Sequence, residues 1–235
     1  MMFRLLGALM LIGLATSANA QCRQALALGL DVSGSVDARE YRLQMDGLAQ
    51  ALSASTVQSK LLSQTDTPVM LLVYEWSGPN DQHTVLPWQP MTSVQDLEQI
   101  IAVLQNTQRR DASPGTALGQ AMQVGAAHLS KADCWAKTLD ISGDGKSNLG
   151  IRPRDAKPLL APQGITVNGL VIGADAPTIS DTRQTEIGEL SSYFRAEVIL
   201  GPDAFVETSL GFADYAAAMT RKLVRELQEV QLSLR

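Results

Sequence analysis

The segment Leu28-Gly29-Leu30-Asp31-Val32-Ser33-Gly34-Ser35-Val36-Asp37 contains the most informative pattern in the chain. It closes an apolar run, 25–30, whose length is typical of a strand buried on both faces of a parallel sheet. Asp31, Ser33 and Ser35 stand at alternate positions, so an extended backbone would turn their oxygens to one side. Gly34 lets the chain bend closely around whatever these oxygens hold. The sequence therefore predicts a buried parallel strand whose carboxyl end presents oxygen ligands.

Strand and helix patterns alternate along the rest of the chain. Further strand-like runs occur at 69–74, 84–86, 138–141, 165–172 and near 204–207. Helical patterns occur at 37–52, 93–104, 118–129, 154–160, 182–193 and from 212 onwards. This alternation predicts a doubly wound α/β sheet. Since no linker, repeat or low-complexity tract divides the chain, we expect a single domain over 22–235.

Two later segments bring polar groups to the same edge of the predicted sheet. Thr116 lies at the start of a helix, and Asp144 follows a central strand between two glycines. Such sheets place their sites in the loops beyond the carboxyl ends of the strands. Three hydroxyls and two carboxylates, with no sulfur or imidazole, suit Mg²⁺, Mn²⁺ or Ca²⁺. Because only two of these ligands are charged, the ion would keep positive charge that attracts a carboxylate from a partner.

These residues, in this order and on these elements, resemble the metal-ion-dependent adhesion site of von Willebrand factor A (vWA) domains. The resemblance spans nearly all of the chain after residue 21. Through 28–37 and Gly211-Phe212-Ala213-Asp214, the chain is similar to bacterial secreted single-domain vWA proteins of unassigned function. The resemblance implies a six-stranded, mostly parallel sheet of strand order 3-2-1-4-5-6, with one antiparallel edge strand and flanking helices.

The resemblance also implies a set of metal ligands. Mg²⁺ would be bound by the hydroxyls of Ser33, Ser35 and Thr116, while Asp31 and Asp144 would bind it directly or through water. A partner's Asp or Glu would complete the coordination shell. One departure is that the second aspartate, usually preceded by Thr or Ser, here follows Gly143, so a hydroxyl that could support Asp144 is missing.

Residues 1–20 are typical of a secretory signal peptide. Arg4 precedes the apolar run 5–15, and Ala18-Asn19-Ala20 supplies a small-x-small cleavage site. A membrane-anchoring helix is the weaker interpretation, because spanning a bilayer takes about 20 apolar residues. We expect cleavage after Ala20, a periplasmic or secreted product, and no membrane span in the mature chain.

The only two cysteines, Cys22 and Cys134, both lie in the predicted mature chain. In an oxidising compartment such a pair favours a disulfide. Cys22 precedes Asp31 by nine residues, and Cys134 precedes Asp144 by ten. If the two strands are parallel neighbours with their aspartates at one end, both cysteines lie at the other end. Two unpaired buried thiols are the alternative.

Composition excludes several classes of function. The 235 residues carry 19 Lys and Arg against 24 Asp and Glu, a net charge of −5, with no basic cluster for nucleic acid. With two histidines and no Gly-x-Ser-x-Gly elbow, nucleophilic catalysis lacks its usual residues. Gly145-Lys146-Ser147 imitates the end of a phosphate-binding loop, but the first glycine of that motif is replaced by Asp140, so we expect no nucleotide.

Polar residues around the predicted site form its rim, and we interpret each of them as solvated. They are Asn80, Asp81, Arg109, Arg110, Asp111, Lys146, Asn148 and Asp175.

Three hypotheses follow for the function. The first is an exported binding module that captures an unknown protein carboxylate through the ion. The second is a structural subunit of a periplasmic or surface assembly, in which the ion only braces the loops. A metal-assisted hydrolase comes last, because no spare His or Glu is placed as a general base.

Overall fold

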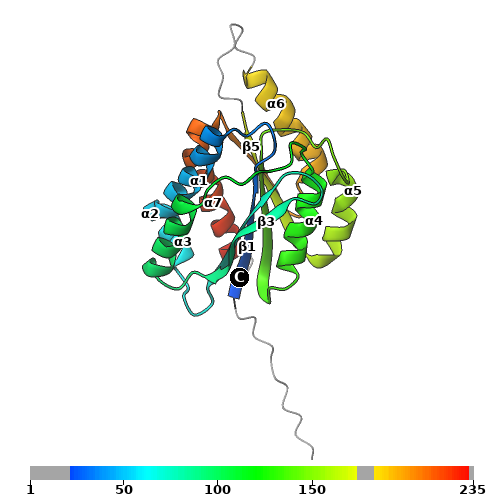
Figure 1. Ribbon diagram of the computed structural model, residues 1–235. Helices are drawn as coiled ribbons and strands as arrows, with labels where there is room; N and C mark the ends of the chain where they lie inside the picture. Colours follow the sequence, from blue (N-terminus) through cyan, green and yellow to red (C-terminus); the bar gives the residue numbers. More distant parts are fainter. Residues whose placement is uncertain (1–21, 174–182, 233–235) are drawn as a thin grey trace, which may run out of the picture.

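Six strands form one sheet that has helices on both faces (Figure 1). The computed structural model describes residues 22–173 and 183–232. The strands are β1 (Cys22–Asp31), β2 (Val69–Trp76), β3 (Gln82–Pro90), β4 (Cys134–Gly143), β5 (Ile165–Ile172) and β6 (Val206–Ser209). Their order is β3-β2-β1-β4-β5-β6, and every neighbouring pair is parallel except β2 and β3. The predicted strand order and the single antiparallel edge strand are confirmed.

The helices divide between the two faces, each over its own apolar core (Figure 1). One face carries α1 (Ala38–Ser53), α2 (Ser55–Leu61), α3 (Val94–Asn106) and α7 (Tyr215–Leu232). The other carries α4 (Leu118–Leu129), α5 (Pro153–Leu160) and α6 (Arg183–Tyr193), which continues into a π-helical turn, Phe194–Val198. Short 3₁₀ turns occupy Ala161–Gln163 and Phe212–Asp214.

The central strand β1 is buried along its whole length, as its apolar run predicts. Leu26, Leu28 and Leu30 belong to the core beneath α1 and α7. On the opposite face the side chains are small, and a Cβ added at Gly29 would lie 2.6 Å from the hydroxyl oxygen of Tyr74. That hydroxyl donates a hydrogen bond to the carbonyl oxygen of Ala121 on α4. Small residues on β1 therefore let α4 and Tyr74 pack closely over the centre of the sheet.

Several boundaries differ from the sequence prediction. The edge strand β3 runs from Gln82 to Pro90 rather than over 84–86, because an outer strand can hold prolines without losing ladder hydrogen bonds. The helix α2 was not predicted; it begins directly after the end of α1, with no side-chain cap to mark its start. The last helix begins at Tyr215, after the 3₁₀ turn at Phe212.

The predicted disulfide is present between Cys22 and Cys134, whose Cα atoms are 4.7 Å apart. The two residues face each other in the β1–β4 register, at the opposite end of these strands from Asp31 and Asp144. The alternative of two unpaired thiols is wrong. The predicted signal peptide, 1–20, lies outside the described residues. Within the part of the chain that is described, none of the helices is long and apolar enough to cross a membrane.

Candidate metal site

The five predicted ligands lie together in one hydrogen-bonded cluster beyond the carboxyl ends of β1 and β4. Ser35 donates from Oγ to Asp144 Oδ1 at 2.7 Å, and its Oγ lies 3.2 Å from Ser33 Oγ. The hydroxyl of Thr116 donates to Ser33 Oγ at 3.4 Å. Asp31 joins the cluster by accepting, at Oδ1, a hydrogen bond of 2.9 Å from the Ser33 amide. The cluster therefore brings together three separate segments of the chain.

The loop after β1 has a tightly defined path. Its first amide, that of Val32, continues the sheet by donating to the carbonyl of Trp76, and the amide of Val36 turns back to the carbonyl of Ser33. Between them, the amide of Gly34 donates to the carbonyl of Pro114. A Cβ added at Gly34 would lie 3.0 Å from Pro114 Cα, so glycine is what allows this close approach.

The electrostatics of the cluster favour a cation. Asp31 is fully buried, and its Oδ2 has no hydrogen-bond partner among the described residues. Burial, and after it the negative charge of Asp144, raises the pKa of Asp31 to about 7. Burial also raises the pKa of Asp144, against the opposing hydrogen bond from Ser35. A buried carboxylate is unfavourable unless it is paired or coordinates a metal, so this donor set fits a hard divalent cation.

Hydroxyls would have to supply much of the coordination. Among residues 22–173 and 183–232, no group of three or more His, Cys, Asp or Glu could hold a metal ion. The cluster offers two carboxylates only, and the other three side chains are neutral. That composition is the one that the sequence predicts for an oxygen-only site with room for a further ligand.

The loop after β4 holds Thr116 in place. The Thr116 amide donates to Asn148 Oδ1 at 2.8 Å, and the Asn148 amide donates back to the Thr116 carbonyl at 2.9 Å. Ser147 adds a third hydrogen bond, from its hydroxyl to the same carbonyl at 3.2 Å. The interpretation of Asn148 as a merely solvated rim residue is wrong, since this residue ties the segment that bears Asp144 to the one that bears Thr116.

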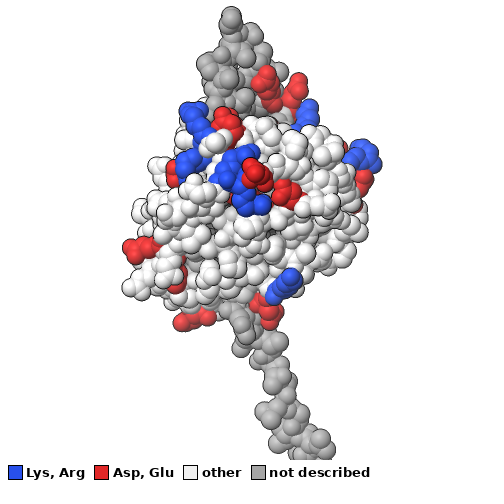
Figure 2. Space-filling view, viewed as in Figure 1, with Lys and Arg blue, Asp and Glu red and all other residues white. Residues whose placement is uncertain are grey.

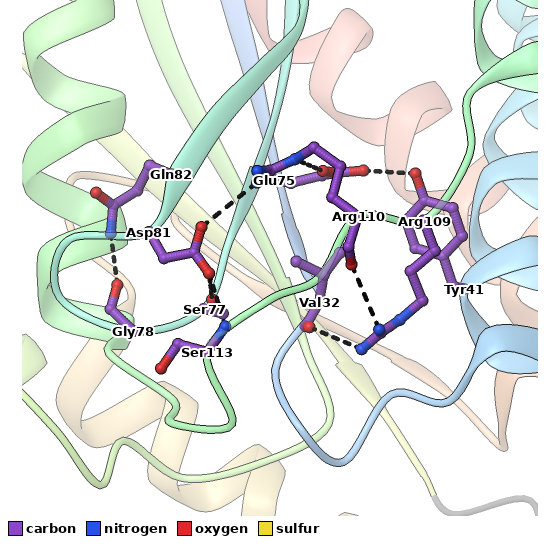
Figure 3. Close-up of polar contacts among 10 residues, drawn as sticks. All are labelled: Val32, Tyr41, Glu75, Ser77, Gly78, Asp81, Gln82, Arg109, Arg110 and Ser113. Atoms are coloured by element: carbon purple, nitrogen blue, oxygen red, sulfur yellow. Dashed lines mark hydrogen bonds and ion pairs between the residues drawn. The ribbon is translucent and has the colours of Figure 1, made fainter.

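The arginines of the rim are also engaged. Arg110 lies 3.5 Å from the buried carboxylate of Glu75 and 3.4 Å from Asp81 (Figure 3). Hydrogen bonds from the amide of Ser113 and the hydroxyl of Ser77 hold the pKa of Asp81 below its usual value. Figure 2 shows most charged side chains of this face, of both signs, gathered toward this end of the molecule. These contacts correct the prediction of a solvated side chain for Arg110 and Asp81. Asn80, Asp111 and Lys146 are exposed, as predicted, and Asp175, also assigned to the rim, lies outside the described residues.

The missing hydroxyl at Gly143 has a steric reason. A Cβ added there would lie 3.3 Å from Asp31 Oδ2, 3.4 Å from a ring carbon of Phe194 and 3.5 Å from one of Trp76. Glycine thus leaves the space that the Asp31 carboxylate occupies beside two aromatic rings.

We expect Gly143→Ala to lower the free energy of unfolding by about 1 kcal/mol, the lower end of the usual cost of overpacking, because only the contact with Asp31 Oδ2 at 3.3 Å is tight. Urea unfolding in EDTA would measure the change. Gly145→Ala is the matched control, because a Cβ added at Gly145 meets no atom of the described residues within 4 Å. Equal stability changes in the two variants would contradict this steric account.

Comparison with known proteins places the chain in a family. Residues 21–231 match the family described as "Protein of unknown function (DUF1194)". The chain belongs to this DUF1194 family. A search of curated proteins found no match.

Solved structures to which this DUF1194 chain is similar are vWA-type domains, and the likeness shows the fold. Proximal thread matrix protein 1 (PTMP1) from the mussel byssus is 19% identical with a TM-score of 0.59, covering 89% of this chain and 48% of PTMP1. The pilus adhesin SpaC from Lactobacillus rhamnosus GG is 14% identical with a TM-score of 0.59, covering 90% of this chain and 31% of SpaC. A von Willebrand factor type A protein from Catenulispora acidiphila is 14% identical with a TM-score of 0.58, covering 88% of this chain and 43% of that protein. The chain therefore spans half or less of the length of these three proteins.

Proposed function

We propose that this chain is an exported protein-binding module of the adhesion type, which captures a carboxylate of a partner protein through a bound divalent ion. The ion is Mg²⁺, with Mn²⁺ or Ca²⁺ as substitutes, held by Asp31, Ser33, Ser35, Thr116 and Asp144. In this proposal residues 1–20 are a cleaved signal peptide, 22–235 form a single vWA domain, and the product is periplasmic or secreted.

The unpartnered, fully buried Oδ2 of Asp31 is the observation that carries the proposal. The hydroxyls of Ser33, Ser35 and Thr116 are linked to one another in the same cluster, and hydroxyl oxygens satisfy a cation without adding charge. Two of the similar proteins support this interpretation. One PTMP1 structure has zinc in its metal-ion-dependent adhesion site (MIDAS) motif, and SpaC is a pilus adhesin. Both proteins are less than 20% identical to this chain in sequence, and their properties support the proposal.

Each residue of the cluster has a distinct role in the proposal. Asp31 and Asp144 bring the negative charge, and Asp144 also orients Ser35 through their hydrogen bond of 2.7 Å. The loop hydroxyls of Ser33 and Thr116 lie deeper, where both residues are buried. When bound, the ion would supply an electrophilic centre for an incoming carboxylate oxygen. Ser35 is exposed, so the partner would approach from its side of the cluster.

The structural alternative rests on the hydrogen bonds that already join the three loops, from Ser35 to Asp144 and from Thr116 to Ser33. In that case the ion would brace the loops of an assembly, and chelation would leave a formed complex intact. Enzymatic hydrolysis is the least supported function, because the five-residue cluster contains no His or Glu that could act as a general base.

Thermal unfolding of the mature protein in EDTA, followed by titration with Mg²⁺, Mn²⁺ and Ca²⁺, tests the proposed site. An ion at about 100 times its dissociation constant should add about 2.7 kcal/mol, which is roughly 5–10 °C for a domain of this size. Thr116→Val keeps the shape of the side chain and removes its hydroxyl, so we expect it to lose at least half of that shift.

Thr220→Val is the matched control for this experiment. The Thr220 hydroxyl donates to the carbonyl of Ala216 within α7 and takes no part in the cluster, so the ion-dependent shift should be unchanged. If none of the three ions shifts the unfolding temperature, the proposed metal-dependent function is wrong. The partner itself would then be sought by pull-down with and without the chelator.

A further inference from the structure

Arg109 contacts the backbone on both sides of two proposed metal ligands. Its Nη2 donates to the carbonyl of Val32 at 3.3 Å (Figure 3). The same nitrogen donates to the carbonyl of Val36 at 3.0 Å. Val32 immediately precedes Ser33, and Val36 immediately follows Ser35. One guanidinium nitrogen therefore spans the loop that presents both hydroxyls.

The segment that carries Arg109 is itself held firmly. Arg110, the next residue, pairs with Glu75 and with Asp81. Asp81 in turn accepts, at 2.7 Å, a hydrogen bond from the amide of Ser113. Glu75 is fixed from its other side by the hydroxyl of Tyr41, at 2.6 Å. The 107–117 segment is thus anchored to β2 and to the turn that follows it, so the backbone of Arg109 is held in place.

We propose that Arg109 is a positioning residue of this site, which sets the spacing of the Ser33 and Ser35 hydroxyls and thereby the affinity for the divalent ion. The inference rests on the proposed function, because it concerns the same site. Arg109 binds backbone carbonyls rather than the ion or the partner. Outer residues that orient metal ligands in this way typically change metal affinity by about 10–100-fold when they are replaced.

The direction in which the ion affinity changes when Arg109 is replaced distinguishes a positioning role from a simple effect of its charge. A cation close to a cation site repels the ion, so removal of its charge alone would tighten binding. Loss of the two carbonyl contacts, in contrast, lets the loop between Val32 and Val36 relax and weakens binding. Positioning therefore predicts weaker binding in Arg109→Met even though a positive charge has been removed.

The test measures binding of Mn²⁺ alone to the mature protein, for wild type, Arg109→Met and Arg109→Lys. We expect the dissociation constant to rise about 10–100-fold in Arg109→Met. Arg109→Lys keeps the charge and a donor, so it should recover part of the affinity; it also keeps the test usable if the methionine variant does not fold. Arg221→Met is the control, since Arg221 likewise donates to a backbone carbonyl, that of Thr208, but next to β6 at the far edge of the sheet.

Amide hydrogen exchange of the metal-free proteins gives a readout that does not depend on the ion. In the wild type the amides of Ser33, Gly34 and Val36 are all hydrogen-bonded. We expect their exchange to be about tenfold faster or more in Arg109→Met and unchanged in Arg221→Met, because local opening sets the exchange rate.

Unchanged or tighter Mn²⁺ binding in Arg109→Met, in a wild type that binds the ion, would overturn the proposal. If the wild type binds no Mn²⁺, the proposed function fails separately, and exchange alone decides on Arg109. Faster exchange confined to the loop would then support positioning, and unchanged exchange would overturn it.

Discussion

Lys222→Met is expected to lower the free energy of unfolding by about 3–5 kcal/mol, the usual cost of removing one partner from a buried ion pair. Lys222 is fully buried on α7, with its Nζ 2.8 Å from Asp140 Oδ2 and 2.6 Å from Glu226 Oε1. Asn168 donates to the same Glu226 oxygen at 2.8 Å. Burial lowers the pKa of Lys222, but the two carboxylates raise it more, so the ammonium stays charged. Without it, two carboxylates would remain buried between α7 and the centre of the sheet.

Urea unfolding would measure this loss, with Lys146→Met as the control. Lys146 is exposed and lies 3.8 Å from an equally exposed Glu189, and such surface pairs contribute only about 0–1 kcal/mol. Replacing the Asp140–Lys222–Glu226 cluster as a whole with apolar residues of similar volume should recover most of the stability. Equal losses in the Lys222 and Lys146 variants would show that the buried cluster contributes no more to stability than the exposed ion pair.

The sheet was predictable because its signals are local. The apolar run before Asp31 is short and bounded by polar residues, and a second strand pattern, 138–141, which includes Asp140, precedes Asp144. Counting back from the two aspartates, by nine and by ten residues, also placed Cys22 and Cys134 at the same end of the sheet, and in the β1–β4 register they are direct partners. Those predictions needed only strand geometry and the resemblance to vWA domains.

Contacts between loops were not predictable in the same way. Arg109 lies 77 positions from Val32, and Thr116 lies 32 positions from Asn148, and no periodic pattern connects either pair. Their conformations depend on tertiary packing, so composition made Arg109 and Asn148 look like ordinary solvated residues of the rim. For the buried ion cluster a signal did exist: Lys222 and Glu226 fall three and seven residues after Met219, on the same inner stripe of α7.

Asp31→Asn is expected to raise the free energy of unfolding in the absence of metal and to lower it, relative to the wild type, when metal is bound. In EDTA the variant should be more stable than the wild type at neutral pH, because it replaces a fully buried charge that faces Asp144 with a neutral amide. The amide oxygen can still accept the hydrogen bond from the Ser33 amide. With saturating Mg²⁺ the order should invert, since the wild type alone would gain about 2.7 kcal/mol at about 100 times its dissociation constant.

The pH dependence gives the same prediction a second, independent signature. An aspartate ionises at about pH 3.9 in an unfolded chain, whereas burial and then the charge of Asp144 raise the pKa of Asp31 in the folded protein to about 7. Over this interval the folded state holds a proton that the unfolded state has lost, so the stability of the metal-free wild type falls as the pH rises from about 4 to 7. Asp31→Asn lacks this titration, and its stability should change less across the same interval.

Unfolding free energies measured at pH 5 and pH 8, in EDTA and in Mg²⁺, would check both parts. Asp155→Asn is the control, because Asp155 is exposed and its carboxylate pairs with the exposed Arg152 and not with a residue of the cluster. A wild type more stable than Asp31→Asn in EDTA at pH 8 would mean that other groups already neutralise the Asp31 carboxylate. The cation would then no longer be required to explain a buried acid at this position, and the hydrogen-bonded cluster would act as a brace between loops.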